Sequence, residues 1–172
     1  MAPRVFVPRR PAPQQLQNSQ LTADDRMAII DLFDHIINAG QQHTLGDLFT
    51  PDGELHLPKG VVKGAANVAA HFVSFAPMAR GNRHLTLNTI LHDGAGAHAA
   101  ANGAPAPRTA RASSYRLLHR ASSPPVLLAS GTIEDELAWC EEERRWRFSR
   151  REFVMDPPAA AGGVQQRVVE QQ

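Results

Sequence analysis

The stretch from Val126 to Val154 reads VLLASGTIEDELAWCEEERRWRFSRREFV and decides the fold class of the chain. Two long runs within it, 126–140 and 145–154, contain the aliphatic, β-branched and aromatic residues that favour strands. The charged residues 141–144 separate these runs and are typical of a solvent-exposed turn. The pattern predicts an antiparallel hairpin made of two long strands.

Two further long strands are predicted before this hairpin, at residues 83–92 and 108–119. The Gly-, Ala- and Pro-rich segment 94–107 between them is longer than a hairpin needs, and it is predicted to be a surface insertion. A short strand is predicted earlier in the chain, at residues 54–57.

Three helices are predicted in the first half of the chain. The first begins near Thr22, because the acidic residues that follow suit the positive end of a helix dipole. Its apolar residues recur at helical spacing and form one core-facing stripe: Ile29, Leu32, Phe33, Ile36 and Ile37. Gly40 suits the end of this helix, and further helices are expected at 43–49 and 65–75.

Three N-terminal helices followed by long strands predict an α+β fold, with the helices on one face of a strongly curved antiparallel sheet. Such a sheet with helices across its open side forms a cone, and the mouth of the cone is a natural apolar pocket. One domain is expected at residues 21–156. Residues 1–20 and 157–172 lack apolar periodicity and are expected to be flexible tails.

Composition narrows the classes of function. A chain of 172 residues with a net charge of +1 fits a single domain and has no global field that would attract nucleic acid. No segment reaches the roughly 18 consecutive apolar residues that span a membrane, and the first ten residues lack the apolar core of a secretory signal. The single cysteine, Cys140, has no internal disulfide partner. We therefore expect a cytoplasmic protein that binds neither nucleic acid nor membranes.

Five motifs together resemble the SnoaL-like branch of the nuclear transport factor 2-like (NTF2-like) families. In chain order they are His35–Gly40, Leu48–Gly53 (LFTPDG), Gly64 followed by a helix and Arg83-His84-x-x-x-Asn88, Gly131–Asp135, and Trp146–Arg151. The similarity extends from about Ala23 to Asp156 and implies the cone-shaped fold of polyketide cyclases and bile-acid 7α-dehydratase-type dehydratases. The same fold also carries ketosteroid isomerases, limonene epoxide hydrolase and many non-catalytic binding domains.

His84 is the strongest candidate for a catalytic residue. On a regular strand it shares a face with Thr86 and Asn88, while Leu85 and Leu91 lie on the other face. A histidine exchanges a proton near neutral pH, and the resemblance implies that the dehydratases use a histidine at this position. A hydrogen-bonded structural histidine is the alternative.

Two further polar residues are candidates for the reacting centre. Asn38 stands where the dehydratase-like members carry an aspartate, so it can orient a substrate or cap the first helix but cannot move a proton. Asp135 shares its predicted face with Ile133 and Leu137, which favours a half-buried carboxylate with a raised pKa. An ion pair between Asp135 and an arginine of a neighbouring strand is equally compatible with the sequence.

The remaining candidates would bind substrate. The resemblance implies an arginine at the mouth of the pocket, and either Arg150 or Arg151 suits it, since the two point to opposite faces. Tyr115 either donates to a substrate oxygen or simply packs, and His71 lies on the helix that covers the cone in this fold. The full set of predicted binding residues is Phe33, His71, Asn88, Tyr115, Arg150 and Arg151. No histidine or cysteine spacing matches a metal site and no phosphate-binding loop is present, so neither metal nor cofactor is expected.

These residues predict a cofactor-independent lyase, isomerase or cyclase that acts on a hydrophobic polyketide-, terpenoid- or steroid-like metabolite. Two alternatives remain open: a non-catalytic ligand-binding or dimerisation module, and a template-type cyclase in which Asn38 and an arginine only orient the substrate. A homodimer or small oligomer is also expected, because the helices cover one face of the sheet only. Apolar residues such as Leu85, Leu87, Val126 and Leu128 are left for a partner.

Overall fold

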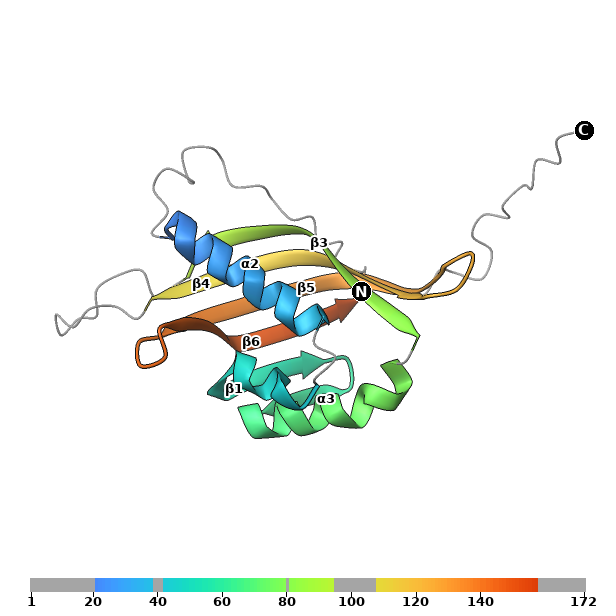
Figure 1. The fold of residues 1–172 in the computed structure, drawn as a ribbon, viewed down its shortest axis with the longest axis horizontal. Helices are drawn as coiled ribbons and strands as arrows, with labels where there is room; N and C mark the ends of the chain where they lie inside the picture. The colour runs from blue at the N-terminus through green and yellow to red at the C-terminus, as the bar shows by residue number, and fades with distance from the viewer. Residues whose placement is uncertain (1–20, 39–41, 80, 95–107, 158–172) are drawn as a thin grey trace, which may run out of the picture.

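The computed structural model describes residues 21–38, 42–79, 81–94 and 108–157, and the side chains of 35–38, 42–43 and 76–79 lie outside this description (Figure 1). The elements in chain order are α2 (Ala23–Asn38), the 3₁₀ helix η1 (Gln42–Leu48), β1 (Phe49–Leu57), β2 (Gly60–Lys63), α3 (Ala65–Ala79), β3 (Asn82–Asp93), β4 (Thr109–Arg120), β5 (Val126–Cys140) and β6 (Arg145–Met155). The predicted tails, 1–20 and most of 157–172, and the predicted insertion at 95–107 lie outside the described residues.

Six strands form one sheet in the order β2-β1-β6-β5-β4-β3. The four long strands β3 to β6 are antiparallel neighbours with bounds within two residues of the prediction. The sheet is nevertheless mixed rather than antiparallel, because β1 runs parallel to β6. Hydrophobic alternation does not encode which strand a segment will pair with, so the sequence pattern could not reveal this pairing.

The prediction of three N-terminal helices was wrong. The described residues contain two α-helices, and the segment expected to form a short α-helix is the 3₁₀ helix η1. Gly46 disfavours an α-helix there, and a Cβ at Gly46 would lie 2.5 Å from the carbonyl oxygen of Ala65, so the segment packs tightly against α3. The strand predicted at 54–57 is part of β1, while β2 was not predicted, and α3 packs against η1, β1 and β2 at one side of the sheet (Figure 1).

The start of α2 confirms the predicted helix cap. The hydroxyl of Thr22 accepts a hydrogen bond from the Asp25 amide at 3.1 Å, and the Asp25 carboxylate accepts one from the Thr22 amide at 3.0 Å. The same carboxylate also accepts from Trp146 Nε1 at 3.1 Å and pairs with Arg108. Burial would raise the pKa of Asp25, but these hydrogen bonds outweigh burial and hold its pKa below the usual value.

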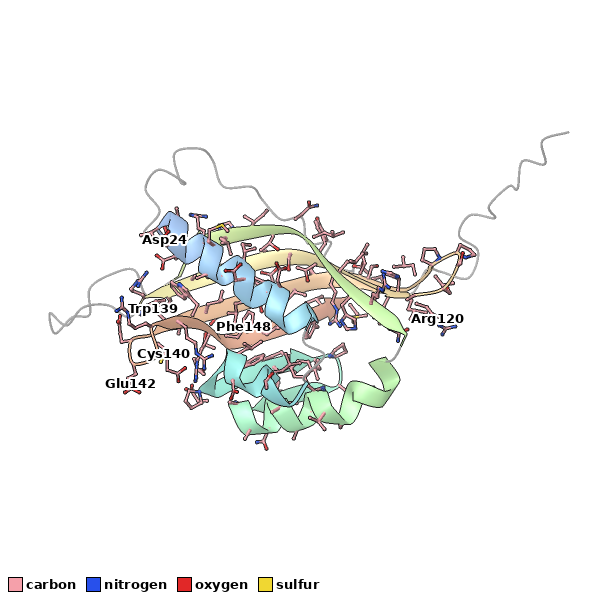
Figure 2. The ribbon with its side chains drawn as sticks, in the orientation of Figure 1. Asp24, Arg120, Trp139, Cys140, Glu142 and Phe148 are labelled. Atoms are coloured by element: carbon pink, nitrogen blue, oxygen red, sulfur yellow. The ribbon has the colours of Figure 1, made fainter. Side chains whose placement is uncertain are left out.

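The core lies between α2 and one face of the sheet, which we call the inner face. Ile29 and Phe33 of α2 are buried against Phe148 of β6 and Leu137 of β5. Phe148 is labelled near the middle of the sheet and close to the path of α2 in Figure 2, with Trp139 toward one end and Arg120 at the other. No helix among the described residues is long and apolar enough to cross a membrane.

A β-bulge in β3 changes which residues reach the inner face. Pairing with β4 shifts by one residue between Leu87 and Ile90, where Asn88 has a φ of 54°. The bulge reverses the alternation, so Leu91 shares the inner face with His84. The expectation that Leu91 lies opposite His84 was therefore wrong. Asn88, expected beside His84, is exposed at the bulge.

Candidate functional site

Polar side chains from four strands meet on the inner face of the sheet. The cross-strand register places Arg151 of β6 opposite Asp135 of β5, and Asp135 opposite Ala112 of β4. Ser114 and Arg116 follow on β4 at two-residue intervals and therefore point to the same face. His84 of β3 lies on this face too, because its register partner Leu118 follows the same alternation. We call Asp135, Arg151, Ser114, Arg116 and His84 the inner polar cluster.

Asp135 and Arg151 form a fully enclosed ion pair. Their side chains are 0% and 2% exposed, and Arg151 Nε lies 3.3 Å from Asp135 Oδ1. The two groups are not aligned for a hydrogen bond, so both carboxylate oxygens lack a donor among the described residues. A buried pair that exists only for stability normally has its remaining oxygens and protons satisfied, and this pair does not.

The surroundings of Asp135 give it the pKa of a group that exchanges protons near neutrality. Burial raises the pKa of Asp135 to about 7, and the neighbouring Glu134 adds to the rise, while Arg151 opposes it. The Ser114 hydroxyl is also completely buried and has no hydrogen-bond partner among the described residues. Polar groups left unsatisfied in a protein interior are costly, and they concentrate at functional sites.

His84 and Arg116 form a second contact in the cluster. A terminal guanidinium nitrogen of Arg116 faces Nδ1 of His84. The same guanidinium nitrogen lies 3.4 Å from Nε2, so Nδ1 is the nearer ring nitrogen. Because a guanidinium only donates, we assign Nδ1 as the acceptor and the ring proton to Nε2. Burial, and then the charge of Arg116, lower the pKa of His84 to about 4. His84 is therefore a neutral hydrogen-bond donor at physiological pH.

Aromatic rings enclose the two arginines. The Arg151 guanidinium lies 4.6 Å from the centroid of the Phe148 ring and 5.3 Å from that of Phe33. The Arg116 guanidinium lies 4.3 Å from the Phe153 ring centroid, and Arg151 lies 5.6 Å from the same centroid. Phe153 thus contacts both cations and fixes their planes through cation–π attraction.

The structure brings only some of the predicted site residues together. His84, Asp135, Arg151 and Phe33 lie at the inner polar cluster, and of the two candidate arginines Arg151 points to this face and is fully buried, whereas the sequence prediction placed an arginine at the mouth of a pocket. Asp135 is fully buried rather than half-buried. The alternative of an ion pair with an arginine of a neighbouring strand is also realised, since the register places Arg151 of β6 opposite Asp135.

Other predicted residues lie elsewhere. Tyr115 pairs across the strands with Leu87 and Thr132 on the outer face, the face turned away from α2. Arg150 also points outward and pairs with Glu152 at 2.6 Å. His71 lies on α3, with its ring 4.6 Å from that of Phe75. Asn38 is the last residue of α2, and its side chain lies outside the described residues.

Sequence reasoning missed Ser114, Arg116 and Phe153. Ala110 and Ala112 of β4 are buried, and Arg116 lies four residues after Ala112. Since every second side chain of a strand points to the same face, this spacing is the one signal in the sequence that could have assigned Arg116 to the inner face. Gly131 lies opposite Arg116, and a Cβ at Gly131 would lie 2.3 Å from the carbonyl oxygen of Val154. This close approach of β5 and β6 explains why a glycine stands there.

An open cleft of about 370 Å³ lies at the other end of the sheet. It runs between the first turns of α2 and the end of the β5–β6 hairpin, and Asp31 and Arg145 are among its lining residues. Two further lining residues, Asp24 and Trp139, are labelled in Figure 2. It does not include the inner polar cluster. Within the described ranges, no group of three or more potential metal ligands comes together.

Comparison with known families agrees with the observed architecture. The family model described as "SnoaL-like domain" matches residues 22–152, which is most of the chain. The chain is a SnoaL-like protein. No functionally curated protein matches this SnoaL-like sequence at a significant level.

Solved structures share the fold of this SnoaL-like protein at low sequence identity. A cystatin-like protein of unknown function from Nostoc punctiforme is 21% identical, covers 80% of this chain and 96% of its own, and superimposes with a TM-score of 0.64. A Catenulispora acidiphila protein in complex with S-DNPA is 17% identical over 78% of this chain and 96% of its own, with a TM-score of 0.60. A provisionally named scytalone dehydratase from Novosphingobium aromaticivorans is 18% identical, covers 77% of this chain and 81% of its own, and superimposes with a TM-score of 0.56. These likenesses establish the cystatin-like, NTF2-like cone.

Proposed function

We propose that this SnoaL-like protein is a cofactor-independent lyase or isomerase, of the dehydratase or cyclase kind, and that Asp135 moves the proton. The substrate class is a hydrophobic, ring-containing metabolite of polyketide, terpenoid or steroid type. One observation carries the proposal: a fully buried carboxylate whose two oxygens have no hydrogen-bond donor among the described residues, next to a buried arginine on the helix-covered face. The family, which includes cyclases and dehydratases, supports the choice of reaction.

The chemistry follows from the charge states in the cluster. The Asp135 carboxylate takes a proton from a carbon beside a carbonyl, and the electron pair of the broken C–H bond moves onto the carbonyl oxygen as an enolate. Arg116 and the Nε2–H of His84 donate hydrogen bonds that stabilise the developing oxyanion. The proton then returns to another carbon, or leaves with a β-hydroxyl group as water. A carboxylic acid with a pKa near 7 suits both directions of transfer.

This proposal assigns proton transfer to Asp135 and not to His84. With a pKa of about 4, His84 is too weak a base to take a proton from carbon near neutral pH. Its suggested part is to orient the substrate and to donate a hydrogen bond. The arrangement compensates for Asn38, since the missing carboxylate at the end of α2 is replaced by one on β5.

A non-catalytic ligand-binding or dimerisation module is the second candidate. It is favoured by the complete enclosure of Asp135 and by two leucines of the outer face, Leu85 and Leu87, which are each 42% exposed. In such a module, the inner polar cluster would only recognise a ligand or stabilise the fold.

Hydrogen exchange in D₂O separates the two candidates without knowledge of the natural substrate. The α-hydrogens of 2-tetralone and of a fused-ring steroid ketone are followed by proton NMR with wild type, Asp135→Asn and the control Glu136→Gln. Glu136 is the adjacent, exposed residue on the outer face. We expect wild type and Glu136→Gln to accelerate exchange and Asp135→Asn to lose about 10²-fold or more of it. Equal exchange by Asp135→Asn, or none by the wild type with either ketone, would favour the binding module.

A further inference from the structure

The inner polar cluster contains more positive than negative charge. Arg151 and Arg116 are both cations, whereas Asp135 is the only acidic side chain that the register places among them. The acidic residues nearest in sequence, Glu134 and Glu136, point to the outer face. With Asp135 ionised the cluster carries one excess positive charge, and with Asp135 protonated it carries two.

Arg116 is the cation of the cluster that has no counter-charge within the part of the chain that the structure describes. Its guanidinium contacts the neutral ring of His84 and the face of Phe153, and neither provides a negative charge. Among the described residues, no carboxylate forms an ion pair with Arg116. The only acidic side chain of the sequence outside the described residues is Glu170.

Arg116 nevertheless keeps its charge. Burial, and then the positive charge of Arg151, lower the pKa of Arg116 to about 10, which leaves the guanidinium protonated near neutral pH. Largely removing a cation from water without a partner costs free energy, and such groups are usually paired with an anion. The site is therefore organised for an anion that the described residues do not supply.

We propose that the ligand of this site is an organic anion, a ring system that carries a carboxylate or an ionised enol or phenol, and that Arg116 binds its negatively charged oxygen. This assignment of substrate class rests on the proposed function. The forked donors of a guanidinium match two oxygens of a carboxylate, and the partly exposed ring of Phe153 beside Arg116 supplies an apolar contact for the rest of the ligand. Arg151 remains the partner of Asp135.

The direct test is a binding measurement with two probes of equal shape. Isothermal titration compares 2-naphthoate with its neutral counterpart 2-naphthamide, for wild type, Arg116→Met and the control Arg111→Met. Arg111 lies on the same strand but is exposed on the outer face. We expect wild type to prefer the naphthoate by about tenfold or more. Arg116→Met should lose this preference and keep its affinity for the amide, whereas Arg111→Met should behave as wild type.

Two additional variants keep the result interpretable. If Arg116→Met does not fold, as judged by its melting curve, Arg116→Lys replaces it and should retain a weaker preference for naphthoate, because it keeps the charge but loses the fork. Glu170→Gln should change nothing. An increase in naphthoate affinity in Glu170→Gln would show that the chain supplies its own anion and would overturn the proposal, as would equal binding of both probes by the wild type.

The failure of this inference is distinguishable from the failure of the proposed function. Asp135→Asn should abolish α-hydrogen exchange yet keep the preference for naphthoate, since Arg116 is intact. If Asp135→Asn leaves exchange unchanged while Arg116→Met loses the preference, the anion site stands and the catalytic proposal falls. If exchange depends on Asp135 while both probes bind equally, the enzyme stands and its substrate is neutral.

Discussion

The guanidinium of Arg116 faces Nδ1 of His84 across the β3–β4 pair, although the two residues are 32 positions apart in the sequence. This contact decides the protonation of His84, because a ring nitrogen that accepts from a guanidinium cannot also carry a proton. His84, which matches a histidine of the resembling family, is therefore a neutral hydrogen-bond donor. The group of the cluster whose pKa lies near 7 is Asp135.

Substitution of His84 separates hydrogen-bond donation from titration. His84→Gln keeps a donor of similar size, so we expect ketone exchange within about tenfold of the wild type, while His84→Ala should lose about 10²-fold. The rate is measured by proton NMR in D₂O from about pH 5 to pH 9, a range that includes the usual pKa of histidine. If both variants lose the same amount of rate, titration and not donation by His84 matters. If the pH dependence of the rate loses one of its limbs only in the His84 variants, His84 is likewise the acid–base group.

Asp135 should make the folded state less stable as the pH rises. Its pKa is raised to about 7 in the folded chain, so between the ordinary aspartate value and about 7 the folded state binds the extra proton. The unfolding free energy then falls with increasing pH by at most about 1.4 kcal/mol per pH unit.

The comparison that isolates this effect is Asp135→Asn against the wild type, by urea unfolding at several pH values. The lowered pKa of His84 has the opposite effect: the unfolding free energy rises with pH between about 4 and the ordinary pKa of histidine. Because both proteins contain His84, this contribution cancels in the difference between them. We expect Asp135→Asn to gain stability relative to the wild type as the pH rises toward 7, and Glu136→Gln to show no such drift. A constant difference across the range contradicts the raised pKa.

Asp25 should be a major stabilising residue of the fold. Its carboxylate caps α2 through Thr22 and ties the helix to Trp146 and Arg108, and its side chain is 7% exposed. Asp25→Ala leaves the buried Trp146 Nε1 without an acceptor, so we expect a loss of about 2–4 kcal/mol of unfolding free energy. Asp24→Ala removes the exposed acid beside it and should cost less than about 1 kcal/mol. Similar losses in the two variants would show that only the helix dipole is involved.

A largely apolar row of side chains on the outer face should pair two copies of the chain. Leu87, Tyr115, Thr132 and Val154 form one row across four strands on the side away from α2, and Leu87 is 42% exposed. We expect light scattering to give a dimer for the wild type at micromolar concentration, and Leu87→Glu to shift it toward monomer because a charge is buried at the contact. Val61→Glu is the control, since Val61 is 47% exposed but lies on β2, at the other edge of the sheet. A monomeric wild type, or equal effects of both variants, refutes the prediction.

Local patterns in the sequence determined much of this structure. Alternating and aliphatic residues placed β3 to β6 within two residues of their observed bounds, and Thr22 placed the start of α2, because strand preference and helix capping depend on residues close in sequence. The resemblance to SnoaL-like proteins was sufficient for the family, and the alternation along β5 placed Asp135 on the face of Ile133 and Leu137.

Only the tertiary structure decided how these pieces became a site. The parallel pairing of β1 with β6, the bulge at Asn88 and the choice of Arg151 as the partner of Asp135 depend on registers between distant segments. The same registers turned Arg116 toward His84 and away from every carboxylate of the described residues with which it could form an ion pair. A one-residue shift in pairing moves every side chain beyond it to the opposite face, and no local pattern in the sequence records such a shift.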